Sequence, residues 1–100
     1  AYKPLPRYPA IGRDMALVVD TAVPVGRMEE KAREVAGELL ESIQVFDIYT
    51  GERLGGGKKS VAFSLVYRTP ERTLTDEEVS ELHGRVVAAL ETEFGAELRK

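Results

Sequence analysis

The sequence predicts an α+β domain in which a four-stranded antiparallel sheet carries two helices on one face. Three segments alternate apolar and polar residues as strands do, and two longer segments repeat apolar residues every three or four positions as helices do. The 100 residues, 43% of them hydrophobic, suffice for one compact domain with a single core. We therefore expect one domain rather than two.

The first half of the chain supplies a strand, a helix and a second strand. Residues 13–21 join β-branched residues to turn-forming residues at both ends, which predicts the first strand. Pro24 suits a first helical turn, and the apolar residues after it recur at helical spacing, which predicts a helix over residues 24–41. Residues 42–50 alternate again and predict the second strand.

The second half repeats this order after a turn rich in glycine at residues 51–57, with a third strand predicted over residues 59–68. The second helix is expected over residues 74–95. Thr75 precedes three acidic residues, and Glu78 stands at capping-box spacing from it, which is typical of a helix start.

Gly95 is placed to end the second helix, and residues 96–100 read as a short edge strand. The resulting βαββαβ order, with right-handed crossovers, is the ferredoxin-like fold, in which both helices cover one face of a sheet. By analogy with that fold we expect the strand order 4-1-3-2.

The chain opens on spaced prolines and on Ala1 rather than Met, so we expect residues 1–12 to be an extended strap or linker from an upstream domain. Residues 13–100 would form the folded domain. The opening residues have no apolar signal-peptide core, and no run of apolar residues is long enough for a membrane span. We expect a soluble, cytoplasmic protein. The absence of Asn, beside many Glu and Arg, fits a thermophilic source.

Composition excludes several kinds of chemistry. The sequence has no Cys and one His, so it can form no disulfide, thiol nucleophile, thiolate metal site or His-rich metal centre. The net charge of −3 is unevenly distributed: residues 24–41 and 74–95 together carry −7, and the other segments carry +4. We expect the face opposite the helices to be mildly positive, which suits a short RNA contact better than bulk duplex binding.

Strand alternation sorts the side chains onto two faces of the sheet. The row expected against the helices is large and apolar: Met15, Leu17, Val19, Phe46, Ile48, Val61, Phe63, Leu65 and Tyr67. The other row is small and polar around one aromatic: Asp14, Ala16, Val18, Asp20, Asp47, Tyr49, Ser60, Ala62, Ser64 and Val66.

This second row has two interpretations. It could be an ordinary solvent-facing sheet surface, as antiparallel sheets often have. Alternatively, Tyr49 offers a π-face on which a nucleic-acid base stacks, and its small neighbours let a nucleotide approach the backbone. Asp47 would then accept hydrogen bonds from a base edge, for which guanine has suitable donors.

Four runs along the chain carry a resemblance to a known family: RYPAIGRDMALVV (7–19), VFDIYTG (45–51), KKSVAFSLVYR (58–68) and RTLTDEEV (72–79). They resemble, in order and spacing, the motifs of the ferredoxin-fold anticodon-binding domain of phenylalanyl-tRNA synthetases, which ends the β subunit of the bacterial enzymes. The resemblance implies that the open sheet face receives the anticodon loop of phenylalanine tRNA, with its first base, guanine 34, as a principal determinant. The residues that it implies for RNA binding are Ala16, Asp47, Tyr49 and Ser60.

The same resemblance implies a domain that binds tRNA without catalytic residues, cofactor or metal of its own. ATP and Mg²⁺ would act elsewhere in the holoenzyme. Its protein partners would be the remainder of the β subunit and the α subunit.

Several other residues have less specific interpretations. Arg13, Lys58, Lys59 and Arg99 are possible phosphate contacts, although an ordinary solvated charge is the alternative for each. Residues 55–60, GGGKKS, resemble a phosphate cradle but precede a strand, so a mobile turn is the better interpretation. His83 is expected on a helix flank, and Arg72 and Thr73 in a structural loop.

Two other functions share this topology. An acyl-phosphate hydrolase pairs an Arg with a water-orienting Asn, and this sequence has no Asn. A regulatory domain that senses amino acids would bind a small ligand at a dimer interface, and titration with free amino acids would detect it.

Overall fold

A computed structural model describes residues 8–99 of the chain. The predicted strap falls mainly on residues 1–7, outside the described residues. The predicted domain boundary at residue 13 lies inside the first strand, because Ile11 and Gly12 already pair with Tyr67 and Val66.

The elements follow the predicted βαββαβ order. They are β1 (Ile11–Asp20), α1 (Val25–Ala36), β2 (Leu40–Tyr49), β3 (Lys58–Tyr67), α2 (Asp76–Phe94) and β4 (Glu97–Leu98), with short 3₁₀ turns η1 (Gly37–Leu39) and η2 (Glu52–Leu54). The strands form one antiparallel sheet in the order β2-β3-β1-β4, which is the expected order read from the other edge. The predicted fold is confirmed.

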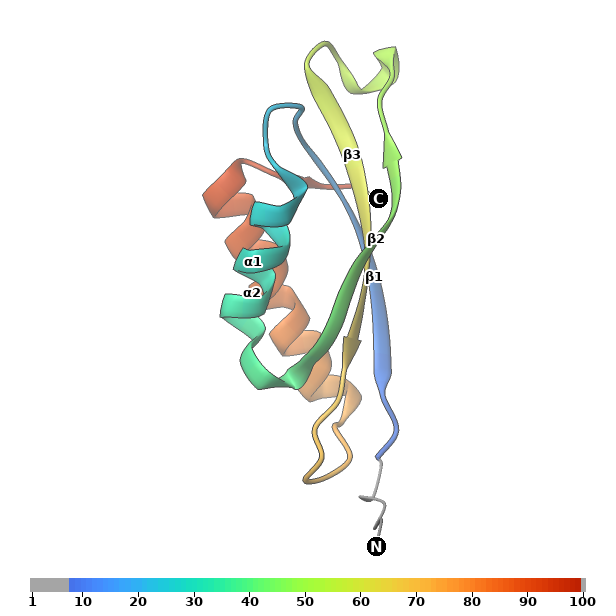
Figure 1. The fold of residues 1–100 in the computed structure, drawn as a ribbon, viewed down its shortest axis with the longest axis vertical. Helices are drawn as coiled ribbons and strands as arrows, with labels where there is room; N and C mark the ends of the chain where they lie inside the picture. The colour runs from blue at the N-terminus through green and yellow to red at the C-terminus, as the bar shows by residue number, and fades with distance from the viewer. Residues whose placement is uncertain (1–7, 100) are drawn as a thin grey trace, which may run out of the picture.

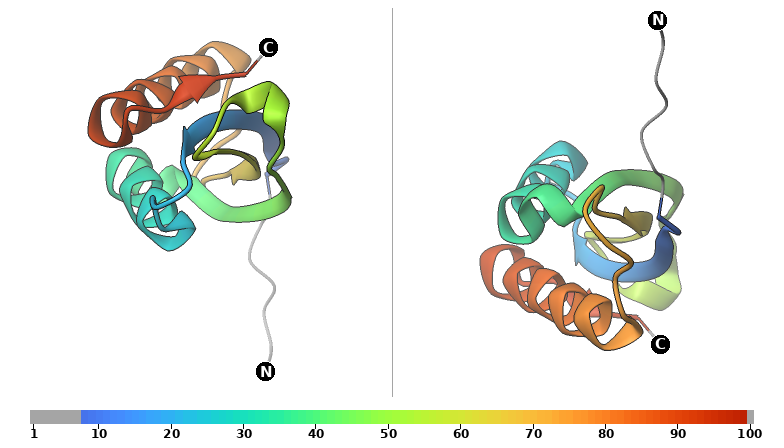
Figure 2. Two further views of the ribbon diagram at one scale, coloured as in Figure 1. Left: turned by 90° about the horizontal axis from the view of Figure 1, so that it is seen from above. Right: turned by 90° about the horizontal axis from the view of Figure 1, so that it is seen from below.

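Both helices cover the same face of the sheet. Figure 1 shows α1 and α2 on one side of the strands, and the two views of Figure 2 show them packed side by side. Within residues 8–99 no helix lies over the opposite face, and we call it the open face.

The core lies between the helices and the facing strand residues. Its largest fully buried side chains are Leu17, Val19, Met28, Val61, Phe63, Leu65, Tyr67, Val79, Val86 and Leu90. The predicted core rows of β1 and β3 are therefore confirmed.

The first helix is shorter than the predicted span of residues 24–41. Gly37 adopts a φ of 65°, where a side chain would be strained, and the chain leaves the helix through η1. Leu40 then begins β2 and is buried. Leu40 fits the helical spacing of apolar residues because it is buried in the same core as the helix residues. It reaches this core from a strand and not from α1.

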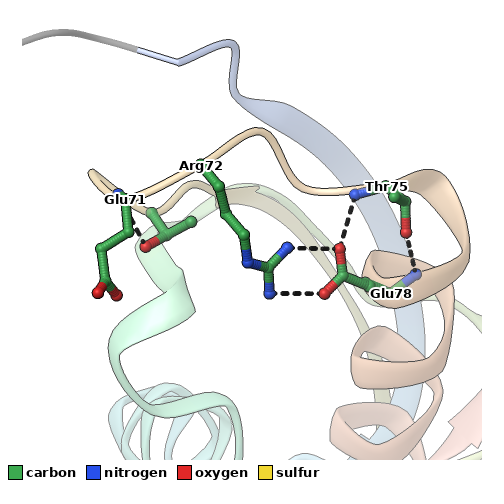
Figure 3. Close-up of polar contacts among 5 residues, drawn as sticks. Glu71, Arg72, Thr75 and Glu78 are labelled. Atoms are coloured by element: carbon green, nitrogen blue, oxygen red, sulfur yellow. Dashed lines mark hydrogen bonds and ion pairs between the residues drawn. The ribbon is translucent and has the colours of Figure 1, made fainter.

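The second helix begins with the predicted capping box (Figure 3). Thr75 Oγ1 accepts a hydrogen bond from the Glu78 backbone N–H at 3.1 Å, and the Thr75 N–H donates to Glu78 Oε1 at 3.0 Å. Arg72 donates two further bonds of 2.7 Å to the same carboxylate. The Arg72 guanidinium, with the Thr75 N–H, lowers the pKa of Glu78 to about 2. Arg72 is thus a structural residue, as predicted.

The second strand departs from the predicted alternation. Val45 pairs with Phe63 and Asp47 with Ala62, so Phe46 is the extra residue of a β-bulge. The prediction that Phe46 and Ile48 lie in the core is wrong, because their side chains are 59% and 53% exposed.

Ile48 is exposed for a different reason from Phe46. It lies opposite the buried Val61, on the helix side of the sheet. However, β2 is an edge strand, and Figure 1 shows the β2–β3 hairpin extending past the ends of both helices. Neither α1 nor α2 covers this end of the hairpin.

A polar pair joins the sheet to α2. Tyr67 Oη lies 2.9 Å from His83 Nδ1, and the two rings meet edge to face. Burial raises the pKa of Tyr67 to about 12 and lowers the pKa of His83 below its ordinary value. Near neutral pH the pair therefore joins a protonated phenol to a neutral imidazole, and the tautomer of the imidazole decides which of the two donates.

We expect the free energy of unfolding to fall as the pH drops from about 6.5 through the lower pKa of folded His83. In this window the unfolded chain binds a proton that the folded chain binds less readily, so acid favours unfolding. Urea titrations at closely spaced pH values measure the effect. His83→Asn keeps an acceptor near Tyr67 without a titrating ring, so it should remove this part of the pH dependence. An unchanged profile in His83→Asn would contradict the assignment.

Candidate nucleic-acid interface

Two rows of side chains cross the open face. The antiparallel pairing places Tyr49 beside Ser60 and Ser60 beside Val18. It also places Asp47 beside Ala62 and Ala62 beside Ala16. Paired residues on neighbouring antiparallel strands point to the same face, so the register brings the four predicted RNA-binding residues, Ala16, Asp47, Tyr49 and Ser60, into two adjacent rows.

The β2 bulge determines which residues reach this face. Ile43 and Val45 pair with the buried Leu65 and Phe63, so they face the helices. If Phe46 were regularly paired instead of bulged, Asp47 and Tyr49 would continue the alternation of Ile43 and Val45 and point toward the helices as well. The bulge therefore turns Asp47 and Tyr49 onto the open face.

The four side chains differ in accessibility. Asp47 is exposed, Tyr49 is 39% exposed, and Ala16 is partly buried. Ser60 is only 3% exposed although it belongs to the open face. Ser60 is therefore covered by side chains on its own side of the sheet.

Two residues that the sequence did not indicate as neighbours determine the surroundings of Tyr49. A Cβ at Gly51 would lie 2.6 Å from Tyr49 Oη and 2.9 Å from Cζ, so only glycine lets the chain pass this close to the ring. The guanidinium carbon of Arg99 lies 5.6 Å from the ring centroid, and Arg99 Nη1 is 3.4 Å from Ser60 Oγ. No spacing in the sequence connects Arg99 with Tyr49, because β4 lies across the sheet from β2.

A shallow hollow of about 430 Å³ adjoins this group at the turn between β2 and β3. It is lined by Thr21, Thr50, Gly51, Gly55, Gly56, Gly57 and Lys58. Lys58 is exposed, and its place in β3 is in phase with Ser60 on the open face. The hollow and Lys58 thus lie at the same end of the open face as Tyr49.

The four possible phosphate contacts divide between the two faces. Lys58 and Arg99 lie on the open face. Lys59 lies on the helix face and donates to the Val23 carbonyl at 2.6 Å. Arg13 also lies on the helix face, 3.6 Å from the Asp76 carboxylate. The structure therefore does not place Lys59 and Arg13 with the other predicted site residues.

The expected positive charge of the open face is absent from its strands. The register places Asp14, Asp20, Asp47, Glu97 and Lys58 on this face, and Arg99, which continues β4, joins them. The expectation was wrong for these residues because a segment's charge does not show which face its side chains take. Several of the basic residues counted there face the helices or pair with acids, as Arg13, Lys59 and Arg68 do.

Over residues 8–99, none of the helices has the length and apolar character needed to cross a membrane. The same residues bring no three His, Asp or Glu side chains together in a way that could hold a metal ion.

Comparison with known proteins matches nearly the whole chain. The family model described as "Ferredoxin-fold anticodon binding domain" matches residues 6–99. A protein named phenylalanine–tRNA ligase beta subunit, from a strain of Bacillus cereus, is 54% identical over 99 residues, which cover 99% of this chain and 12% of that protein. Proteins of the same name from Geobacillus kaustophilus and Clostridium tetani are 53% and 52% identical over 98 residues, or 98% of this chain and 12% of theirs. The chain thus spans about 12% of the length of these relatives.

Proposed function

The chain belongs to the ferredoxin-fold anticodon-binding domain family, and from this premise we propose that its open face binds the anticodon loop of phenylalanine tRNA within a phenylalanine–tRNA ligase β subunit. The observation that carries the proposal is the pairing of β2 with β3, which sets Asp47 and Tyr49 side by side on the face without helices. One of these residues can stack on a base, and the other can read its edge.

Tyr49 supplies the stacking contact. A tyrosine ring that is 39% exposed on a sheet offers a π-face to an unpaired base, and such stacking contributes about 1–3 kcal/mol per base. The adjacent row beside Tyr49 is small, with Ala62 and Ala16 next to Asp47, so a nucleotide can lie close to the strands. Single-stranded RNA loops present bases that are available in this way.

Asp47 supplies the base readout. Its carboxylate is exposed on the open face and only accepts hydrogen bonds when ionised. Guanine offers two adjacent donors, N1–H and the exocyclic amine, whereas adenine presents an acceptor at N1. A carboxylate also repels phosphate, so Asp47 favours contact with a base edge over contact with the RNA backbone.

We expect the domain to bind an anticodon stem-loop with guanine at the first anticodon position about 5- to 150-fold more tightly than one with adenine there, because mismatched polar groups cost about 1–3 kcal/mol. Fluorescence anisotropy at low salt measures both affinities. Asp47→Asn replaces one acceptor by a donor and should reduce the discrimination between the two bases.

Two results would contradict this proposal. Equal affinity of the unmodified chain for both stem-loops would remove the base-reading role of the open face. Full discrimination in Asp47→Asn would assign the reading to another group. Circular dichroism of Asp47→Asn serves as the folding control, since Asp47 is exposed.

In this proposal, the other functions of the ligase are carried out by other parts of the enzyme. We assign ATP, Mg²⁺ and phenylalanine to other parts of the ligase, and we propose the rest of the β subunit and the α subunit as protein partners. The chain would contribute tRNA binding and orientation without a reacting group.

A further inference from the structure

The open face of the RNA-free domain is partly occupied by Arg99. Its guanidinium carbon stands 5.6 Å from the centre of the Tyr49 ring, which is within the range of a cation–π contact. Its Nη1 lies 3.4 Å from Ser60 Oγ, at the long limit of a hydrogen bond. Arg99 therefore lies over two of the four residues proposed to bind RNA.

The burial of Ser60 is consistent with this cover. Ser60 sits in the centre of the sheet, between Tyr49 of β2 and Val18 of β1. Its side chain is 3% exposed even though no helix covers this face. The Arg99 guanidinium stands beside the Ser60 hydroxyl, where a base that contacted this hydroxyl would also have to lie.

Arg99 is fixed at its backbone and held loosely at its side chain. The Arg99 N–H donates to the Ala16 carbonyl at 2.8 Å, which continues the pairing of β4 with β1. The side chain itself is exposed, and within residues 8–99 it takes part in no ion pair. The guanidinium can therefore move while its Cα stays in place.

We propose that Arg99 forms the second wall of a base-binding slot, in which a nucleobase lies between the Arg99 guanidinium and the Tyr49 ring. The proposal rests on the proposed RNA-binding function and adds a residue to it. A base that stacks at about 3.4 Å from the Tyr49 ring on one side and from the Arg99 guanidinium on the other needs these two groups to stand roughly 7 Å apart. Since the guanidinium carbon stands at most 5.6 Å above the ring, it has to move outward by at least roughly 1–2 Å to admit a base.

The chemistry of the side chain fits this position. A guanidinium is planar and stacks on aromatic faces, whereas the ammonium of a lysine is a compact, strongly hydrated charge. A lysine at this position would supply the charge but not the plane.

The test compares Arg99→Ala, Arg99→Lys and Lys58→Ala for binding to two stem-loops, one intact and one with an abasic first anticodon nucleotide. We expect Arg99→Ala to weaken binding to the intact loop about 3- to 30-fold, in line with a cation–π contact, and Arg99→Lys to weaken it nearly as much. Neither variant should change affinity for the abasic loop, which keeps its phosphates but has no base to hold.

Lys58→Ala is the matched control, because Lys58 is an exposed cation on the same face, at the start of β3. This substitution should weaken binding to both loops alike. If Lys58 neutralises one phosphate, the substitution should also lower the slope of log affinity against log salt concentration by about 0.7. Thermal unfolding of each variant verifies the fold.

Other outcomes overturn the proposal in distinguishable ways. If Arg99→Lys binds the intact loop as tightly as the unmodified chain does, Arg99 is a phosphate contact. The same follows if Arg99→Ala loses as much affinity for the abasic loop as for the intact loop. Tighter binding by Arg99→Ala would make it a cover that RNA displaces. If the unmodified chain binds neither loop, the proposed function itself fails, and the slot fails with it.

Discussion

We expect Phe63→Ala to lower the free energy of unfolding by about 3–5 kcal/mol, which is a large part of the stability of a small domain. Phe63 lies in the central strand β3, pairs with Met15 and Val45, and is fully buried. Its ring fills the layer between the sheet and the helices, so its removal leaves a cavity that the rigid sheet cannot close. Urea unfolding followed by circular dichroism measures the change.

Phe46→Ala is the matched control for this experiment. The same chemical change at a side chain that is 59% exposed should cost less than about 1 kcal/mol. Equal destabilisation by the two substitutions would contradict the placement of Phe46 outside the core.

The second large effect is expected at Tyr49. Tyr49→Ala should weaken binding to the anticodon stem-loop by roughly 5- to 150-fold, the equivalent of about 1–3 kcal/mol for one stacked base. Stability should change little, because the ring is 39% exposed and projects from an edge strand. Anisotropy titrations and thermal unfolding on the same samples separate these two effects.

Tyr49→Phe separates the ring from its hydroxyl. It keeps the π-face, so we expect it to retain most of the affinity that Tyr49→Ala loses. A loss as large in Tyr49→Phe would mean that the hydroxyl binds RNA and that stacking contributes little. No loss in Tyr49→Ala would place the RNA on another surface.

The order and kind of the elements could be predicted because they depend on local patterns. The apolar spacing around Met28 and Val86 is that of a helix, and both side chains are buried. Thr75 and Glu78 form the capping box that their spacing indicated. The end of α1 was less predictable, because Leu39 and Leu40 fit a helix as well as they fit the turn and strand that contain them.

The alternation of β2 could not be predicted in full, since a bulge has no signature in the order of apolar residues. Counting outward from Tyr49 gives the correct face for Asp47 but places Phe46 in the core, where the structure leaves it 59% exposed. Strand alternation alone places Arg13 and Lys59 on the helix face. The expected positive charge of the open face was wrong because it counted charges by segment and left this alternation out. The approach of Arg99 and Gly51 to Tyr49 depends on the sheet order and on the path of a turn, so only the three-dimensional structure shows it.

The irregular pairing of β2 has a consequence for self-association. An edge strand with exposed apolar side chains such as Phe46 and Ile48 is a template on which a second chain can add a strand and begin to aggregate. The register of β2 shifts twice, between Leu40 and Ser42 and between Val45 and Asp47, so its outer row of backbone donors and acceptors lacks the even spacing that an incoming strand requires. The same extra residue that turns Asp47 and Tyr49 toward the open face thus also protects the sheet edge against strand addition.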